Sequence, residues 1–177
     1  GNLAVFGTGG TGKSTLLRTL AIAAAVTPRS GPCDVYALDF GSRGLAMLEG
    51  LPHVGAVING SDHERLTRLL SWLKDEVEER SVRYAAAQAG TITEYRERSG
   101  HQDERRILVL VDGFSAFREE YEVSANAGWF TTFGQLAADG RAVGVHFVMA
   151  TDRPSSIPPS LQANIQRRIT LRLADTH

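Results

Sequence analysis

Residues 7–14 contain the combination of residue types best suited to chemistry in this 177-residue chain. Four glycines alternate with threonines and lead into Lys13 and Ser14, which fits the spacing G-x-x-x-x-G-K-S/T. Glycines let backbone N–H groups turn inward around an anion, a lysine ammonium can reach the outer phosphates of a nucleotide, and a serine hydroxyl can bind Mg²⁺. The sequence therefore predicts a phosphate-binding loop that holds ATP and Mg²⁺.

We assign the loop and the residue that follows it to nucleotide binding. The assigned residues are Gly7, Thr8, Gly9, Gly10, Thr11, Gly12, Lys13, Ser14 and Thr15. Lys13 is also expected to act in catalysis, and Ser14 to hold the metal ion. The alternative is a glycine-rich turn that binds nothing. The flanking segments argue against it, because an apolar run precedes the loop and a helix-forming run follows it, with its positive dipole end toward the anion.

Asp112 is the predicted acid of the metal site. It follows residues 107–111, five consecutive apolar residues that are typical of a strand buried on both faces. A carboxylate at the end of a strand beside a phosphate-binding loop holds the Mg²⁺ ion and its water shell in such sites. We expect Asp112 to serve both the metal and catalysis, and the alternative is an aspartate that only caps a loop.

The residue after Asp112 is Gly113, which has no side chain. In many motor ATPases of this kind a glutamate stands here and orients or activates the attacking water. Glu119 and Glu120 lie downstream, but a helical turn is usually too far for them to reach. General-base assistance of typically about 10²–10⁴-fold would then be missing. The sequence therefore predicts tight nucleotide binding with slow hydrolysis.

The remaining candidate residues, for sensing the nucleotide or acting on a neighbouring subunit, are Asp39, Asp152, Arg153 and Arg168. Asp39 ends a predicted strand and either touches the metal shell or a neighbouring subunit, or caps the turn that follows. Asp152 and Arg153 follow a predicted core strand. They either sense the state of the nucleotide or only mark where the strand leaves the core, with the arginine on the surface. Arg168, with Arg167, precedes the last predicted strand and either donates charge across a subunit boundary or is solvated.

The elements that must position these residues alternate between strands and helices. Strands are predicted at residues 3–6, 34–38, 107–111, 145–151 and 169–173, with a short strand or extended link at 54–58. Helices are predicted at residues 15–25, from 61 toward 88, and at 127–138, with short ones at 44–50 and 94–98. This alternation predicts a single α/β domain with a mostly parallel sheet and helices on both faces.

Composition narrows the class of protein further. The formal net charge of -1 argues weakly against nucleic-acid binding by this chain alone. The single cysteine, Cys33, excludes an internal disulfide and a cysteine-based zinc site. No apolar run reaches membrane-spanning length. Because the chain opens almost directly on a strand and has no initiator methionine, we interpret it as a domain excised from a longer protein.

Two segments after Asp112 closely resemble the FtsK/SpoIIIE family of ATPases. They are residues 140–146 (GRAVGVH) and 149–155 (MATDRPS), and residues 51–54, 76–80 and 163–169 match other parts of the same family. Within the family, the chain is most similar to the second or third ATPase modules of the EccC-type proteins of type VII secretion. That closer resemblance is carried by residues 38–41 (LDFG), 111–114 (VDGF) and 172–175 (RLAD).

The resemblance implies a RecA-like P-loop NTPase fold, in a cytoplasmic domain of a membrane-anchored bacterial protein with tandem ATPase modules. It implies sister modules, in the same or neighbouring chains, and a hexamer as the partners. Gly113, and Asp152 where DNA pumps of the family often have glutamine, favour a secreted protein over DNA as the transported substrate. We therefore expect an ATP-binding module of a secretion translocase with weak or no hydrolysis. The alternative is an active ATP-driven DNA translocase.

Overall fold

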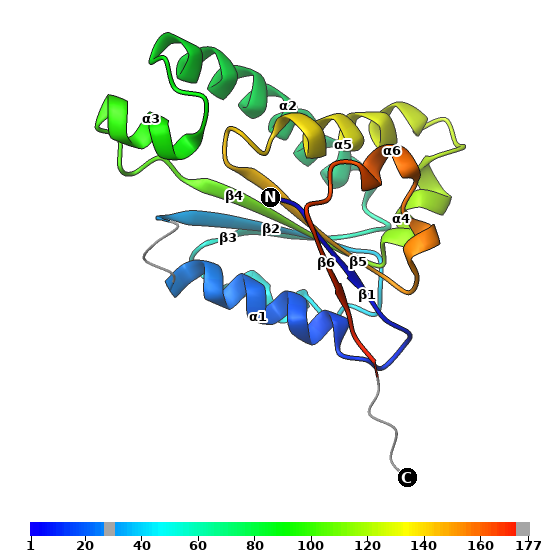
Figure 1. The fold of residues 1–177 in the computed structure, drawn as a ribbon. Helices are drawn as coiled ribbons and strands as arrows, with labels where there is room; N and C mark the ends of the chain where they lie inside the picture. The colour runs from blue at the N-terminus through cyan, green and yellow to red at the C-terminus, as the bar shows by residue number, and fades with distance from the viewer. Residues whose placement is uncertain (27–30, 173–177) are drawn as a thin grey trace.

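A six-stranded parallel sheet lies at the centre of the computed structural model, which describes residues 1–26 and 31–172 (Figure 1). Its strand order is β3-β2-β4-β5-β1-β6, and every neighbouring pair runs parallel. The strands are β1 (Leu3–Phe6), β2 (Cys33–Asp39), β3 (Val54–Asn59), β4 (Arg106–Asp112), β5 (Val145–Thr151) and β6 (Arg167–Thr170). The predicted mostly parallel α/β sheet is therefore confirmed.

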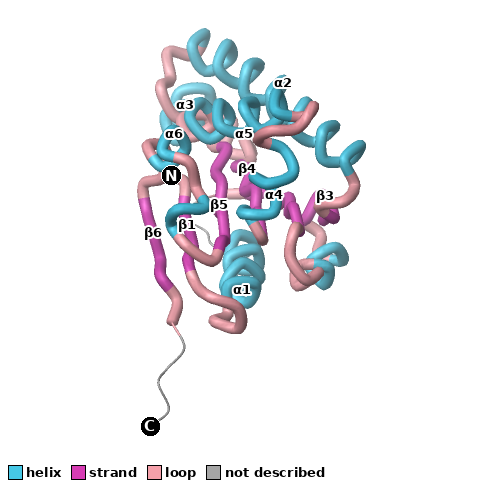
Figure 2. The backbone as a smooth tube through the Cα atoms, turned by 90° about the vertical axis from the view of Figure 1, so that its right-hand side faces the viewer, coloured by secondary structure: helices cyan, strands magenta, loops and turns pink. Residues whose placement is uncertain are grey.

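Helices cover both faces of this sheet (Figures 1 and 2). One face carries α1 (Lys13–Val26) and the 3₁₀ segment η2 (Ala46–Gly50). The other face carries α2 (His63–Ala86), α3 (Ile92–Ser99), α4 (Phe114–Tyr121), α5 (Ala127–Asp139) and α6 (Pro159–Gln162), with the 3₁₀ segment η3 (Pro154–Ser156) before α6. Among the described residues, no helix combines the length and apolar character needed to cross a membrane.

Helix α2 shows how the local sequence determines an element. The Asp62 side chain caps its first turn by accepting a hydrogen bond from the Arg65 backbone N–H at 3.2 Å. The apolar residues spaced three and four apart form the buried face, and these are Leu66, Leu69, Leu70, Leu73 and Val77. The predicted amphipathic helix is confirmed, and it ends at Ala86, two residues before the predicted limit.

A cluster of aromatic rings joins the end of β2 to two of the helices. Phe117 of α4 is fully buried at the centre of this cluster. Its ring centroid lies 5.2 Å from Phe40, after β2, and 5.1 Å from Phe133 of α5. Rings at these separations attract one another beyond the area they bury. The cluster therefore fixes the segment after β2 against the helix that follows β4.

The structure differs from the sequence-based prediction in several parts, among them α6, a helix in a segment where none was predicted, and β6, which ends at Thr170 although the prediction continued to 173. Helix α4 was not predicted, although Phe114, Phe117 and Tyr121 form its buried face at helical spacing. The last strand begins at Arg167 rather than Ile169, so the prediction that Arg167 and Arg168 precede it was wrong. All four residues of β6 are exposed at the sheet edge, so no apolar alternation marks where this strand begins.

Some predicted features lie outside the described residues. Residues 27–30, in the turn-rich break before β2, belong to this group. So do residue 173, the predicted end of the last strand, and residues 174–175 of the closing family motif.

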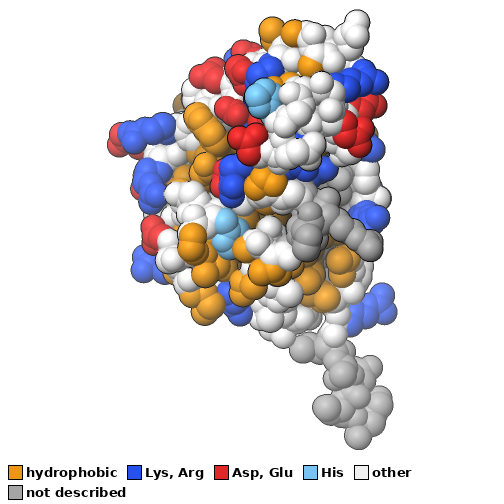
Figure 3. Space-filling model, turned by 90° about the vertical axis from the view of Figure 1, so that its left-hand side faces the viewer, with side chains coloured by type: hydrophobic (Ala, Val, Ile, Leu, Met, Phe, Trp, Pro, Cys, Tyr) orange, Lys and Arg blue, Asp and Glu red, His pale blue; other side chains and the backbone are white. Residues whose placement is uncertain are grey.

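Charges on the surface are mixed rather than segregated on the face drawn in Figure 3. Acidic and basic side chains are interspersed in the upper part and around the rim of this face, and hydrophobic ones gather in its lower half. Such a face creates no extended field of one sign, in agreement with the formal net charge of -1.

The aromatic cluster supplies the first test. Phe117→Ala should lower the free energy of unfolding by about 3–5 kcal/mol, because it leaves a large cavity in a closely packed core. Val123→Ala, at a side chain that is 89% exposed, should change it by less than about 0.5 kcal/mol. Urea denaturation followed by circular dichroism measures both, and equal losses in the two variants would contradict the central position of Phe117.

Candidate nucleotide site

The phosphate-binding loop connects the end of β1 to the start of α1. Gly10 and Gly12 have φ angles of +79° and +91°, which side chains rarely tolerate, so the loop depends on glycine at both positions. Helix α1 begins at Lys13 immediately after the loop. The first backbone N–H groups of a helix have no acceptor within the helix, and its dipole is positive at this end. The local sequence therefore places the N-terminus of a helix, which is suited to binding an anion, at the carboxyl end of β1.

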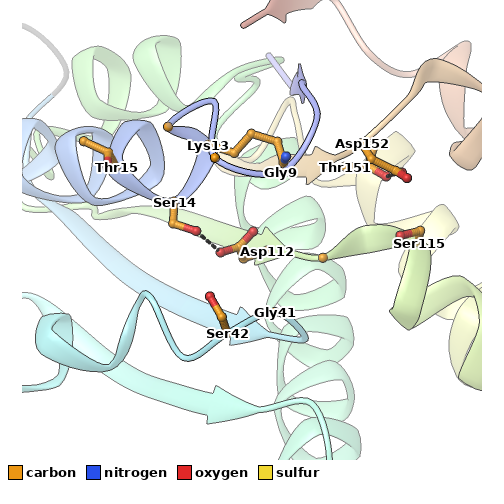
Figure 4. Close-up of a pocket in the computed structure, with 13 residues that line it drawn as sticks. Gly9, Lys13, Ser14, Thr15, Gly41, Ser42, Asp112, Ser115, Thr151 and Asp152 are labelled. Atoms are coloured by element: carbon orange, nitrogen blue, oxygen red, sulfur yellow. Dashed lines mark hydrogen bonds between the residues drawn. The ribbon is translucent and has the colours of Figure 1, made fainter. Parts of the chain in front are cut away.

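A cavity of about 620 Å³ opens at this terminus (Figure 4). The carboxyl ends of parallel strands meet at one edge of a sheet, which is where ligands bind in open α/β folds. The walls of this cavity come from the phosphate-binding loop and α1, the ends of β4 and β5, and the segment after β2. The lining residues are Gly9, Gly10, Gly12, Lys13, Ser14, Thr15, Gly41, Ser42, Asp112, Gly113, Ser115, Thr151 and Asp152.

The two residues predicted to hold the metal ion are in direct contact. Ser14 Oγ donates a hydrogen bond to Asp112 Oδ2 at 2.6 Å, although the residues are 98 positions apart in the chain (Figure 4). Asp112 is only 5% exposed, at the carboxyl end of β4. A hydroxyl and a carboxylate oxygen are the hard oxygen ligands that Mg²⁺ prefers. The residues present therefore fit a Mg²⁺ ion at this point of the cavity.

Lys13 lies over the loop that precedes it. Its ammonium donates hydrogen bonds to the carbonyl oxygens of Gly7 and Thr8, the second at 3.0 Å. Thr11 Oγ1 donates to the same Thr8 oxygen at 2.7 Å, so the loop is held closed from within. These contacts keep the positive charge of Lys13 inside the cavity, where it suits a phosphate chain.

Gly113 is required by the backbone at the end of β4. It has φ +75° and ψ +46° and stands immediately before α4. A Cβ atom at this position would lie 2.9 Å from the carbonyl carbon of Phe40, closer than real Cβ atoms approach backbone, and a tight 3.1 Å from the Gly41 nitrogen. A glutamate here would therefore be strained by its φ angle and would clash with the segment after β2.

Asp39 is a buried carboxylate that organises the segment after β2. Its Oδ1 accepts a hydrogen bond from the Gly41 N–H at 3.0 Å, and its Oδ2 accepts one from the Leu45 N–H at 3.2 Å. Both oxygens are used by backbone groups, so the structure favours the turn-capping alternative for this residue. Through this cap Asp39 holds Gly41 and Ser42 against the cavity.

Asp152 lines the cavity from the end of β5. Its Oδ1 accepts hydrogen bonds from Thr151 Oγ1 at 3.2 Å and from Ser156 Oγ at 3.1 Å. Desolvation acts to raise the pKa of Asp152, but hydrogen bonds from Ser156, from the backbone and from Thr151, together with the charge of Arg153, outweigh it and keep the pKa below its ordinary value. Asp152 is therefore an exposed, ionised carboxylate that two hydroxyls hold by hydrogen bonds. Arg153 lines a neighbouring cavity of about 280 Å³ instead.

Arg168 does not reach this cavity in its own chain. It lies exposed on β6, in register with Ala4 in the middle of β1, and its Nη2 donates to the Gln162 carbonyl at 3.2 Å. It is absent from the described residues that line the cavity. A part for Arg168 in nucleotide chemistry would therefore have to be on a neighbouring subunit, and it stays a prediction.

Two hydroxyl residues of the cavity, Ser42 and Ser115, were not predicted from the sequence. Each had a usable signal, because each stands three residues after a recognised strand-end acid, Asp39 or Asp112. Thr151, at the strand end that carries Asp152, also lines the cavity.

Gly113 provides a test of the local geometry. Gly113→Ala should destabilise the protein by about 1–3 kcal/mol, because it adds left-handed strain and a close contact with the Phe40 backbone. Gly128→Ala is the matched control, since α5 leaves open space around Gly128 and the change should stabilise by about 0.5 kcal/mol. Opposite signs in chemical denaturation are expected, and a neutral Gly113→Ala would contradict the contact.

Comparison with known proteins identifies the lineage of this site. A model of the FtsK/SpoIIIE family matches residues 1–177. The ESX-4 secretion system protein EccC4 of Mycobacterium tuberculosis is 37% identical over 178 residues, covering 99% of this chain and 14% of that protein. The structure of EssC (ATPases 2 and 3) from Geobacillus thermodenitrificans superposes with a TM-score of 0.85 at 30% identity, covering 99% of this chain and 32% of that one.

A third relative was solved with a ligand. EccC (ATPases 2 and 3) from Thermomonospora curvata, in complex with a signal sequence peptide, superposes with a TM-score of 0.84 at 28% identity, covering 98% of this chain and 31% of that one. The chain thus spans about a third or less of the length of these relatives. The predicted resemblance to the FtsK/SpoIIIE family and its EccC-type members is confirmed, as is the RecA-like P-loop fold.

Proposed function

Since this chain belongs to the FtsK/SpoIIIE family, we propose that it is an ATP-binding module of a protein-secretion translocase, with weak or no hydrolysis of its own. The contact between Ser14 and Asp112 is the single observation that carries the nucleotide part. It joins the loop and the strand-end acid into one metal-binding arrangement.

The chain offers a separate group for each part of a Mg²⁺ nucleotide. The N-terminus of α1 and the ammonium of Lys13 suit the phosphates, and Ser14 with Asp112 suits the ion. The cavity of about 620 Å³ lies within the usual range of small-molecule sites. When bound, Mg²⁺ supplies charge neutralisation and a fixed orientation for the phosphates.

Slow hydrolysis follows from what the cavity lacks beside Asp112. Gly113 gives no acid there, and the backbone contact with Phe40 opposes one. Losing such assistance typically costs about 10²–10⁴-fold in rate. Binding depends instead on the loop, on α1 and on Lys13, which are intact. ATP then acts mainly as a ligand that stabilises the folded module in proportion to its concentration over Kd.

The wider assembly is part of the same proposal. The chain covers 14% of EccC4, which supports a single domain, residues 1–177, within a longer multi-module protein. Its partners are then sister modules in the same or neighbouring chains, arranged as a hexamer, on the cytoplasmic side of a membrane-anchored parent. The peptide bound by the Thermomonospora curvata relative supports a secreted protein as substrate.

The nucleotide site is tested by removing its central charge. Lys13→Ala should weaken Mg²⁺–ATP binding by about 10–100-fold, because one charge-assisted bond to phosphate contributes about 1.5–3 kcal/mol. Lys74→Ala, an exposed lysine on α2, should leave the affinity unchanged. Isothermal titration measures both. If the wild-type chain instead hydrolyses ATP rapidly in a Lys13-dependent way, the slow-hydrolysis part of the proposal is wrong.

The class of transported substrate is tested by measuring the binding of two polymers, a peptide and a duplex DNA. We expect the chain to bind a signal sequence peptide from a secreted protein and to show no salt-sensitive binding of duplex DNA at physiological ionic strength. The net charge of -1 and the mixed surface in Figure 3 underlie this expectation. Fluorescence anisotropy with labelled peptide and labelled duplex measures both, and tight salt-sensitive DNA binding would favour the DNA translocase instead.

A further inference from the structure

We propose that Asp152 is the catalytic carboxylate of this module, orienting and deprotonating the attacking water for its slow ATP hydrolysis. The inference rests on the proposed ATP-binding function and adds the group that carries its residual chemistry. It places the base at the end of β5, on the strand beside Asp112, rather than on the residue directly after Asp112.

The strand register places Asp152 at the carboxyl end of the sheet, where the cavity lies. Strands β4 and β5 are neighbours, and Asp112 pairs with Ala150, so Asp152 stands two residues beyond the level of Asp112. Asp112 and Asp152 line the same cavity. Figure 4 shows the Lys13 side chain extending from α1 toward the end of the cavity where Asp152 lies. A lysine of this loop reaches the outermost phosphates, so Asp152 faces the end where a nucleotide is cut.

The other carboxylates near the site are already used or lie elsewhere. Among the described residues that line the cavity, only Asp112 and Asp152 carry a carboxylate. Asp112 accepts the bond from Ser14 in the metal arrangement, and both oxygens of Asp39 accept backbone bonds. Glu119 lines the neighbouring cavity of about 280 Å³ instead. Asp152 is thus the one acid of this cavity that remains for a water.

The Asp152 side chain is held in place before any ligand binds. Both hydroxyl bonds, from Thr151 and from Ser156, converge on Oδ1, and the exposed carboxylate can accept a further hydrogen bond from a ligand or a water. Ser156 is itself anchored, because Arg118 of α4 donates to its carbonyl oxygen at 3.0 Å. A fixed carboxylate avoids the cost of ordering a base during the reaction.

The proposed hydrolysis requires only water, ATP and the Asp152 carboxylate as reacting groups. The water oxygen forms a bond to the γ-phosphorus, and the bond from that phosphorus to the oxygen bridging it to the β-phosphate breaks. The water proton passes to the Asp152 carboxylate, and the electron pair of the broken bond stays with the leaving ADP. The products are ADP and inorganic phosphate, and the Asp152 proton is released to solvent.

Asp152→Asn tests this role because the amide oxygen can still accept the Thr151 and Ser156 bonds while the negative charge and the base are lost. Single-turnover hydrolysis of radiolabelled ATP should fall by about 10²-fold or more. The affinity for Mg²⁺–ATP should rise by about 3–10-fold because one charge no longer repels the outer phosphate, whereas ADP affinity should stay the same. Fluorescent-nucleotide titration measures both affinities, independently of turnover.

Glu119→Gln is the matched control, an acid of the next cavity that should change neither turnover nor the ratio of ATP to ADP affinity. Unchanged turnover in Asp152→Asn would overturn the inference. So would an equal weakening of ATP and ADP binding with a lowered melting temperature, since that indicates a structural role. A wild-type chain that binds ATP without any turnover overturns this inference alone, and one that binds no ATP overturns the proposed function.

Discussion

The backbone of Gly113 and the backbone of Phe40 meet at the carboxyl ends of β4 and β2, too closely for a side chain to stand between them. The Phe40 N–H donates to the Asp112 carbonyl oxygen at 2.9 Å, which ties the two strand ends together. On its other side the Phe40 ring packs against Phe117 of α4. Because of this contact, Asp112, the segment after β2 and helix α4 form one unit.

The cavity at the carboxyl ends of the strands is shaped by that unit. The close approach allows the left-handed turn at Gly113, which directs α4 into the aromatic cluster and brings Ser115 to the cavity. It also leaves no room for an acid after Asp112. A glutamate directly after Asp112 would therefore require the backbone at the ends of β2 and β4 to move.

The charged groups that line the cavity are negative in sum, so under the proposed function a phosphate chain binds there together with a cation. Lys13 contributes one positive charge and α1 a partial one, while Asp112 and Asp152 each bring a negative charge. A phosphate chain added to this set would meet an excess of negative charge without a cation. The contact between Ser14 and Asp112 marks where that cation fits, and this explains why binding and Mg²⁺ belong together in the proposed function.

Sequence alone determined the parts whose causes are local. The loop could be read because its glycines, Lys13 and Ser14 are neighbours in the chain, and β4 and α2 because apolar runs and helical spacing mark burial directly. Strand β6 was predicted two residues too late, at residue 169, since its first two residues are exposed arginines that carry no apolar pattern. Tertiary structure decided that Asp39 caps a turn, that Arg168 lies away from the cavity, and why residue 113 is glycine. Each of these depends on contacts between segments brought together only by the sheet, and no local pattern in the chain encodes them.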